Sequence, residues 1–265
     1  MLYVYLFSCA VLFIYATTMF ALACIKKDNS IMDIAYGPAF LVASYVTAFI
    51  ALTLFPLAPH SVLILLFITI WALRLATRIY RKNKGKPEDF RYKAWRDAWI
   101  LKGKAYFYTR SYLQIFLLQA LVVSIVLLPF TLTVQNIGQF MVLSYLGITL
   151  WCTGFLFEST ADAQLDRFIK DPNPLKGLIM HSGLWKYSRH PNYFGESLMW
   201  WGLAFLGFSI SGNPFVFLSP ILITYLLLYV SGIPMLEKRF AGNSEWEAYK
   251  ARTSAFVPMP PKQDA

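Results

Sequence analysis

Residues 183–201 read GLWKYSRHPNYFGESLMWW and pass from a basic, aromatic stretch into an apolar helix without a break. Arg189, His190, Asn192, Tyr193 and Glu196 lie at this change of character. Ionisable groups at the mouth of a membrane span are costly to desolvate, and more often serve a site than a fold. The stretch therefore predicts a membrane helix whose first turns carry a functional site.

The composition of the whole chain favours a membrane protein. Hydrophobic residues make up 57% of the 265 and charged residues only 14%, whereas a soluble domain carries about a quarter charged residues. Cys9, Cys24 and Cys152 lie in apolar segments without metal-ligand spacing, so we predict no metal site. The net charge of +10 fits attraction to anionic lipid headgroups, and we expect no nucleic-acid partner.

Seven apolar runs are long enough to cross about 30 Å of hydrocarbon. The predicted fold is therefore an all-α integral membrane protein with about seven transmembrane helices. The expected spans are residues 2–25, 34–55, 61–80, 111–130, 138–157, 193–210 and 214–234.

The distribution of basic residues orients these spans. With the N-terminus outside and the C-terminus cytosolic, all 24 Lys and Arg residues fall in inner segments or at their helix ends. The outer loops, residues 56–60, 131–138 and 211–213, contain none. Positively charged loops mark the cytoplasmic side, so we expect a multi-pass protein of the bacterial inner membrane. In the basic loop 81–110, Trp95 and Trp99 share one face of a predicted interfacial helix.

A row of acidic residues follows the fifth span. Glu158, Asp162 and Asp166 recur every four residues and would repel one another by a few tenths of a kcal/mol per pair unless cations or hydroxyls faced them. Arg189 and His190 are possible partners, and an acidic face can also bind ribose hydroxyls. For Asp166 we favour a solvated helix extension, while for Glu158 and Asp162 both interpretations stay open.

Two further groups of residues are candidates for a site. Asp33 and Tyr36 share a face at the mouth of the second span, where the phenol could donate a proton to a substrate carbonyl or carbanion. A helix cap and an interfacial Tyr explain them equally well. Glu237 ends the seventh span and opens a tail with Trp246 and Tyr249, which suits either a membrane-surface segment or a flap over a cofactor.

The chain resembles the steroid 5α-reductase superfamily, in its bacterial branch of largely unassigned function, which is distantly similar to the isoprenylcysteine carboxyl methyltransferases. The resemblance covers nearly the whole chain and depends on the order of its pieces. These pieces are NSIMDIAYG, GKPEDFRYKAWR, FESTADAQLDRF, GLWKYSRHPNYFGE, SGIPMLEKR and YKARTSAFVP.

The resemblance implies a seven-helix membrane reductase that binds NADPH from the cytosolic side. Since the sequence shows no fixed-period repeat and no low-complexity segment, we expect a single membrane domain over residues 1–265. Its substrate-side helices would lie in 1–130 and its cofactor-binding half in 131–265. By residue match, Asn192 and Glu196 would contact the nicotinamide end and Asp162 the nucleotide. Glu158 stands where steroid reductases carry an Asn. The Gln-Glu pair by which these enzymes hold a substrate carbonyl has no counterpart here.

The leading hypothesis is an NAD(P)H-dependent reductase of a conjugated C=C bond in a lipophilic substrate. Asp33 and Tyr36 would polarise or protonate this substrate. The expected cofactor-binding residues are Glu158, Asp162, Arg189, His190, Asn192, Tyr193, Glu196 and Glu237. The Arg-His-Pro-x-Tyr core also suits an S-adenosylmethionine-dependent membrane methyltransferase. A non-catalytic lipid-binding membrane protein is the third alternative.

Overall fold

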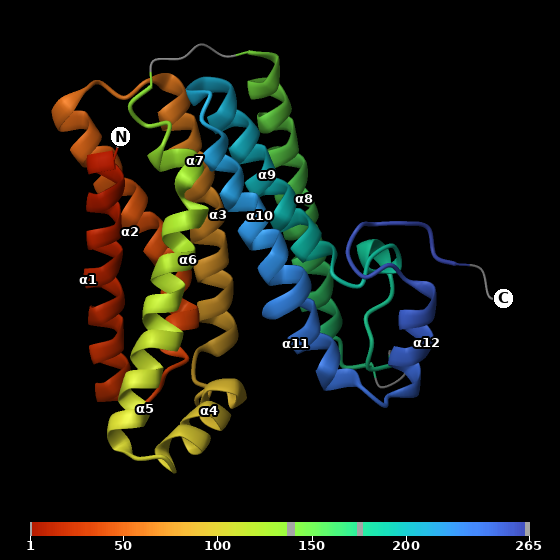
Figure 1. Ribbon diagram of the computed structural model, residues 1–265. Helices are drawn as coiled ribbons and strands as arrows, with labels where there is room; N and C mark the ends of the chain where they lie inside the picture. The colour runs from red at the N-terminus through yellow and green to blue at the C-terminus, as the bar shows by residue number, and fades with distance from the viewer. Residues whose placement is uncertain (1, 137–140, 174–176, 263–265) are drawn as a thin grey trace. The chain divides into compact units, whose positions relative to one another are not determined.

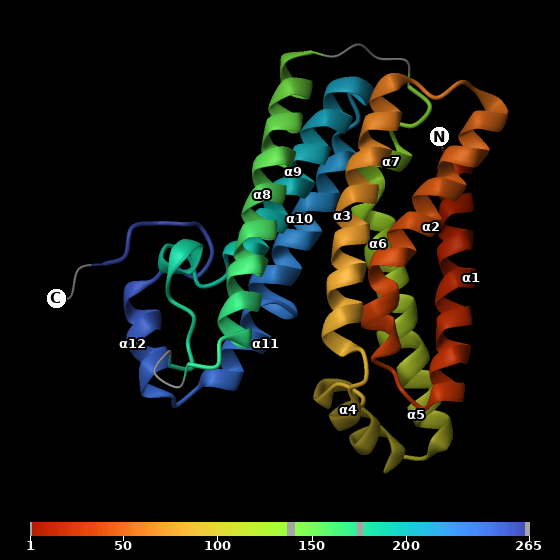
Figure 2. The ribbon, with the colours of Figure 1, turned by 180° about the vertical axis from the view of Figure 1, so that it is seen from behind.

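The computed structural model describes residues 2–136, 141–173 and 177–262 (Figures 1 and 2). Helices make up 79% of the structure, and the described residues form no strand, which confirms the predicted all-α class. By their contacts the residues divide into two compact units, each described by itself below. Unit 1 comprises residues 1–139 and 210–216, and unit 2 comprises residues 140–209 and 217–265.

Unit 1 is a bundle of long helices with a short-helix connection at one end. In Figures 1 and 2, α1, α2, α3 and α6 lie side by side, and α4 and α5 follow the end of α3. The helices are α1 (Leu2–Lys26), α2 (Ile31–Leu54), α3 (Pro59–Asn83), α4 (Phe90–Ile100), α5 (Lys104–Ser111), the π-helix η1 (Tyr112–Leu117), α6 (Leu118–Val126) and α7 (Leu128–Thr131).

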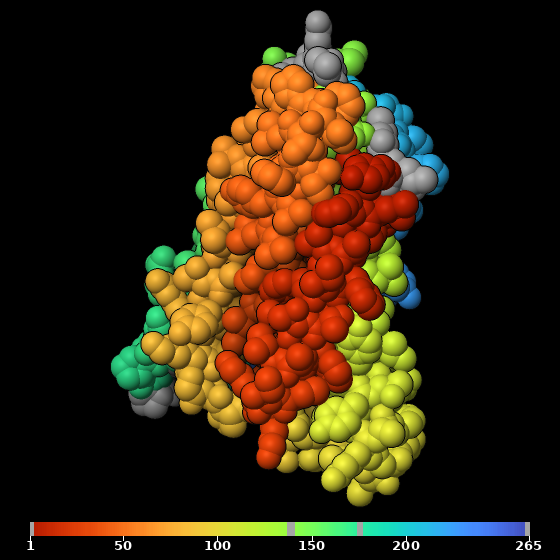
Figure 3. Space-filling model, turned by 90° about the vertical axis from the view of Figure 1, so that its left-hand side faces the viewer, coloured from red at the N-terminus to blue at the C-terminus, as the bar shows by residue number. Residues whose placement is uncertain are grey.

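Close contact between α2 and α3 builds the core of unit 1. A Cβ added at Gly37 would lie 2.9 Å from the Ala72 carbonyl oxygen, so only Gly allows this approach. The ring of Phe40 then meets Trp71 edge-on, with centroids 5.0 Å apart, and both side chains are buried. In Figure 3, α1 faces the viewer in red. Apolar side chains of this helix, such as Phe13 and Ile14, are exposed.

Unit 2 packs three long helical segments beside a small group of loops and short helices. Its helices are α8 (Val142–Lys170), the 3-10 helix η3 (Gly183–Lys186), α9 (Pro191–Ser211), α10 (Leu218–Tyr225), the π-helix η5 (Leu226–Val230), α11 (Ile233–Glu237), the 3-10 helix η6 (Lys238–Phe240) and α12 (Ser244–Arg252). The 3-10 helix η4 (Pro214–Phe217), of which residues 214–216 belong to unit 1, leads into α10.

Glycines set the spacing between α8 and α9. A Cβ at Gly154 would lie 2.6 Å from the Gly195 carbonyl oxygen, and one at Gly147 would lie 2.6 Å from that of Gly202. Small residues allow the backbones of membrane helices to approach each other in this way. The crossing fixes how the first turns of α9 lie against the polar part of α8.

Six helical segments in the described residues are long and apolar enough to cross a membrane, which supports a multi-pass integral membrane protein. They are Tyr3–Lys26, Ile31–Leu54, Pro59–Asn83, Lys104–Val126, Val142–Lys170 and Pro214–Phe240. The remaining predicted span, residues 193–210, does form the 21-residue helix α9. Its first turns carry the polar residues Asn192 and Glu196.

The predicted fifth span differs in extent from the helix observed. The fifth span was expected over residues 138–157, of which 138–140 lie outside the described residues. Its helix, α8, continues to Lys170 and so includes the whole acidic row. Hydropathy marks only the part of a helix that suits lipid, so it could not locate this end. The interfacial helix is confirmed as α4, where the rings of Trp95 and Trp99 stack 5.9 Å apart.

Candidate functional site

The start of α9 is fixed by hydrogen bonds of the residues that directly precede Pro191. The Ser188 hydroxyl accepts from the His190 backbone N–H at 3.1 Å and donates to the Phe256 carbonyl at 2.8 Å. Pro191 occupies the first helical position, where its missing N–H needs no partner. The residues before α9 therefore form a rigid connection to the C-terminal segment.

Arg189 is the centre of this connection. Its Nε donates to Glu237 Oε1 at 2.9 Å, and its Nη1 donates to the carbonyls of Lys250 and Thr253 at 3.0 and 2.9 Å. The Arg189 backbone N–H also donates to the Ser254 carbonyl at 2.8 Å. Only 9% of Arg189 is exposed, so each of these contacts compensates for the desolvation of a buried cation.

His190 joins the same carboxylate. Its Nε2 lies 3.1 Å from Glu237 Oε1, and its ring stacks on Tyr193 with centroids 5.5 Å apart. Arg189 and His190, both buried, and the partly buried Glu237 thus form one cluster, called the arginine cluster below. The structure brings these three predicted site residues together, but their contacts are with one another and with the C-terminal backbone. Their predicted role in cofactor binding stays a prediction.

A second group of predicted residues meets where α8 and α9 cross. Glu158 and Asp162 are buried on α8, with 3% and 4% of their surface exposed. The Asn192 side-chain amide donates to Asp162 Oδ1 at 3.3 Å. The Asn192 Oδ1 atom is also buried, and it has no hydrogen-bond partner among the described residues. A buried acceptor of this kind costs about 1–3 kcal/mol unless a ligand or water satisfies it.

The glycine crossing positions these polar groups. A Cβ at Gly195 would lie 2.5 Å from the Glu158 backbone nitrogen, so α9 touches α8 directly at Glu158. Glu196 follows in the next position of α9, one turn beyond Asn192. The acidic row of α8 therefore does not extend into solvent at Glu158 and Asp162, whereas Asp166 is half-buried.

Several contacts of this region could not be found from the sequence. The Tyr249 hydroxyl donates to the carbonyls of Trp185, at 2.5 Å, and Ser188, at 3.3 Å. Burial raises the pKa of the Tyr249 phenol above its usual range, so it stays a donor at physiological pH. The Glu245 carboxylate accepts from the backbone N–H groups of Leu178 and Ile179. Nothing in local sequence signals contacts over more than 60 residues.

Asp33 and Tyr36 lie in unit 1, on α2, and the structure gives Asp33 partners that the sequence did not suggest. The Asp33 carboxylate accepts from Arg91 Nη2 at 2.7 Å and from the Tyr92 hydroxyl. The ring of Tyr36 packs edge-on against Phe40, with centroids 5.2 Å apart. The phenol bonded to Asp33 therefore comes from α4. The catalytic roles of Asp33 and Tyr36 stay predictions.

Electrostatics hold this contact between α2 and α4 together. Burial alone would lower the pKa of Arg91, but the carboxylates of Asp89 and Asp33 raise it above its usual value. Burial and the Asp33 carboxylate both raise the pKa of Tyr92 well above its usual range. Arg91 is therefore charged and Tyr92 protonated over the physiological pH range.

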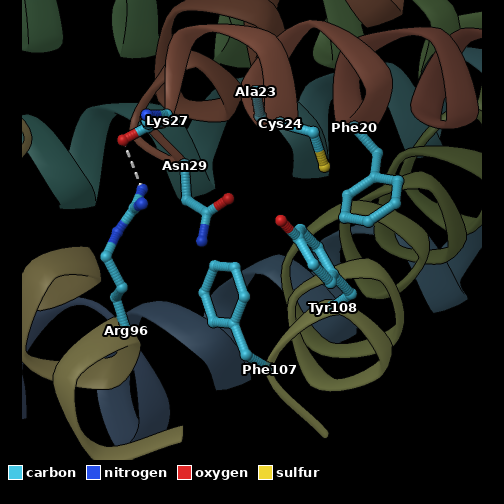
Figure 4. Close-up of a pocket in the computed structure, with 8 residues that line it drawn as sticks. All are labelled: Phe20, Ala23, Cys24, Lys27, Asn29, Arg96, Phe107 and Tyr108. Carbon is cyan, nitrogen blue, oxygen red and sulfur yellow. Dashed lines mark hydrogen bonds between the residues drawn. The ribbon is translucent and has the colours of Figure 1, made fainter. Parts of the chain in front are cut away.

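A small cavity of about 30 Å³ lies elsewhere in unit 1, beside the turn between α1 and α2 (Figure 4). Arg96 Nη2 donates to the Lys27 carbonyl at one side of it. Its lining includes none of the predicted site residues. The residues around it are Phe20, Ala23, Cys24, Lys27, Asn29, Arg96, Phe107 and Tyr108. No group of three or more His, Cys, Asp or Glu in the described residues could hold a metal ion.

The fold and the site define the class: a helical membrane protein with buried ionisable residues at the start of a helix. The family described as "Protein of unknown function (DUF1295)" matches residues 19–253, and the chain belongs to this family. No solved structure matches the chain.

Two curated relatives are similar to part of the chain. Both are named 3-oxo-5-alpha-steroid 4-dehydrogenase 1. The protein of Homo sapiens is 36% identical over 72 residues, and that of Macaca fascicularis is 35% identical over 72 residues. Each match covers 27% of this chain and 27% of the relative, so the chain matches about a quarter of the relatives' length. These matches are consistent with the steroid 5α-reductase superfamily.

Proposed function

We propose that the protein is a membrane reductase that uses NADPH to reduce a conjugated C=C bond in a lipophilic substrate. The observation that carries this proposal is the buried, unsatisfied Oδ1 of Asn192 beside the buried carboxylates of Asp162 and Glu158. The names of the two curated relatives support an oxidoreductase. The expected membrane is the bacterial inner membrane, with the basic helix ends in the cytosol.

The polar groups at the α8–α9 crossing suit the cofactor. A carboxamide NH₂, as nicotinamide carries, would satisfy Asn192 Oδ1, and Glu196 lies one turn away on the same helix. The carboxylates of Asp162 and Glu158 can accept hydrogen bonds from ribose hydroxyls. When bound, the cofactor would supply the hydride. Exclusion of water by the glycine crossing would strengthen each of these hydrogen bonds.

The arginine cluster would not touch the cofactor, but would fix the backbone that carries the cofactor-binding residues. Arg189 and His190 immediately precede α9, and Glu237 holds them to the end of α11. This arrangement fixes the position of the first turn of α9, and with it that of Asn192 and Tyr193. Among the predicted cofactor residues, Arg189, His190 and Glu237 are therefore assigned as positioning residues.

The substrate side of the reaction is assigned to unit 1. Asp33 and Tyr36 remain the proposed groups that polarise or protonate the substrate. Arg91 and Tyr92 would hold the Asp33 carboxylate in one orientation, since both donate to it. The apolar surfaces of the membrane helices would admit a lipophilic substrate from the bilayer.

Thermal unfolding of the purified protein with either cofactor tests the proposal. A ligand that binds only the native state at 100 times its Kd adds about 2.7 kcal/mol of stability. We expect NADPH to raise the Tm and S-adenosylmethionine to leave it unchanged. Asn192→Ala should abolish the NADPH shift, whereas the matched change Asn213→Ala, beyond the other end of α9, should retain it.

The other outcomes point to the other two functions. A shift with S-adenosylmethionine or its demethylated product, without one for NADPH, would identify a methyltransferase instead. A chain that responds to neither cofactor, and whose cellular role survives Asn192→Ala and Glu196→Ala, would be a non-catalytic lipid-binding protein.

A further inference from the structure

The C-terminal strap, defined as residues 253–262, is an irregular segment beside the residues that precede α9. Its backbone is fastened by the Ser254 and Phe256 carbonyls, which accept from Arg189 N–H and the Ser188 hydroxyl. Further along, the Met259 N–H donates to the Tyr187 carbonyl at 2.9 Å. The strap therefore has a fixed place on unit 2.

This place is level with the first turns of α9. The Phe256 ring packs edge-on against Phe194, in the first turns of the helix, with centroids 5.7 Å apart. Phe194 in turn contacts Phe157 of α8. The 21 residues of α9 rise about 31 Å, which matches the hydrocarbon thickness of a bilayer. If α9 spans the membrane, its first turn and the strap beside it lie at the membrane surface.

The outward face of the strap is apolar with a basic rim. Val257 and Met259 are 49% and 52% exposed, and Tyr187 beside them is 42% exposed. Lys186, Arg252 and Lys262 are also exposed. Residues 183–190 and 250–262 contain no Asp or Glu, so the charge of the rim has a single sign. An apolar centre with a cationic rim is the pattern of segments that lie on anionic membranes.

The prolines of the strap lower the cost of placing an irregular backbone in lipid. Each unpaired N–H in hydrocarbon costs several kcal/mol, but Pro258, Pro260 and Pro261 have no N–H. Met259 does have one, and it is bonded to Tyr187. Across residues 258–261 the strap therefore brings no unpaired N–H group to the bilayer.

We propose that the strap is a membrane-surface segment, which inserts Val257 and Met259 among the headgroups of anionic lipids and so anchors the extramembrane part of unit 2. The proposal does not depend on the activity proposed above. It places the strap against lipid, and assigns it no role as a flap over a cofactor.

Spin labels at positions 257 and 259 measure directly whether these side chains contact lipid. Val257→Cys and Met259→Cys would be made in a chain whose three cysteines are replaced by Ala, labelled with a nitroxide, and placed in vesicles of phosphatidylglycerol and phosphatidylcholine. Leu146→Cys, exposed on α8 near the middle of the expected span 138–157, is the lipid reference. Glu247→Cys, exposed on α12, is the aqueous reference.

We expect the ratio of oxygen to nickel-chelate accessibility at positions 257 and 259 to lie several-fold above the aqueous reference, toward the lipid reference. A ratio equal to the aqueous reference would overturn the proposal. Protection from both reagents would also overturn it, because protein would then cover the strap. The double change Arg252→Glu and Lys262→Glu should lower the ratio in anionic vesicles, and an unchanged ratio would refute the anionic preference.

The native chain offers a second measurement that needs no substitution. After irradiation in vesicles with a photoactivatable phosphatidylglycerol, trypsin releases residues 253–262, because Arg252 and Lys262 bound this peptide. We expect lipid adducts on it, at a yield well above that of peptides from α12. A yield equal to that of α12 would overturn the proposal even if the cysteine-free chain did not fold.

Discussion

Replacing Gly195 by Ala is expected to push α9 away from α8 at Glu158. The new Cβ would lie 2.5 Å from the Glu158 nitrogen and 2.6 Å from the Gly154 oxygen, both backbone atoms of α8. Ordinary contact starts at 3.4 Å, so the helices must separate locally by about 0.9 Å. If the whole of this separation reaches Asn192, it stretches the 3.3 Å hydrogen bond between Asn192 and Asp162 beyond hydrogen-bonding distance.

Gly202→Ala is the control that distinguishes an effect on stability from an effect on the geometry of the site. Its Cβ would lie 2.6 Å from the Gly147 oxygen and the Trp151 nitrogen, a similar clash two turns further along α9. Overpacking of this kind costs about 1–3 kcal/mol, offset by up to about 1 kcal/mol because Ala favours a helix. Both variants should therefore lose comparable stability, and only Gly195→Ala should disturb the Asn192 site.

Thermal unfolding without and with NADPH is the assay. Both variants should have a lower Tm than the wild type, whereas the NADPH shift should be weakened by Gly195→Ala and retained by Gly202→Ala. A Gly195→Ala protein as stable as the wild type would refute the steric reasoning. Equal loss of the NADPH shift in both variants would refute the local effect on Asn192.

Three further predictions concern the arginine cluster, the buried phenol and unit 1. Arg189→Met should cost up to about 3 kcal/mol, because it leaves the partly buried Glu237 carboxylate without this cation. In thermal unfolding, Arg189→Met with Glu237→Leu should be less destabilised than Arg189→Met alone, and equal losses would contradict this. Tyr249→Phe should cost about 1–2 kcal/mol at neutral pH. Folding raises the pKa of Tyr249, so the stability that its protonated phenol contributes is complete below pH 10 and falls by about 1.4 kcal/mol per pH unit above it. Between pH 8 and 11, the Tm of Tyr249→Phe should therefore fall less than the Tm of the wild type. A constant difference between the two Tm values would argue against this. Asp33→Asn should abolish turnover while the NADPH shift persists, with Asp97→Asn, an exposed ion-pair residue, as the control; full turnover in Asp33→Asn would remove Asp33 from the mechanism.

Helix content and the position of most spans follow from the sequence because hydropathy reports directly on lipid contact. The start of α9 was predictable for a local reason as well, since Ser188 and Pro191 act on their own neighbours. Trp95 and Trp99 could be placed on one face because helical spacing alone brings them together. The end of α8 was missed because hydropathy marks only the part of a helix that suits lipid, and the acidic row with Glu158 and Asp162 lies beyond that part.

The sequence alone determined that the chain is a helical membrane protein with polar residues at the mouth of α9, because apolar length and local spacing carry that information. Tertiary structure decided which partners those residues have. Arg189 contacts Glu237 and C-terminal carbonyls more than 45 residues away. Asp33 accepts hydrogen bonds from Arg91 and Tyr92 of α4. Such pairs depend on how close two helices approach, and at the α8–α9 crossing that distance is set by glycines, which carry no chemical signal of their own.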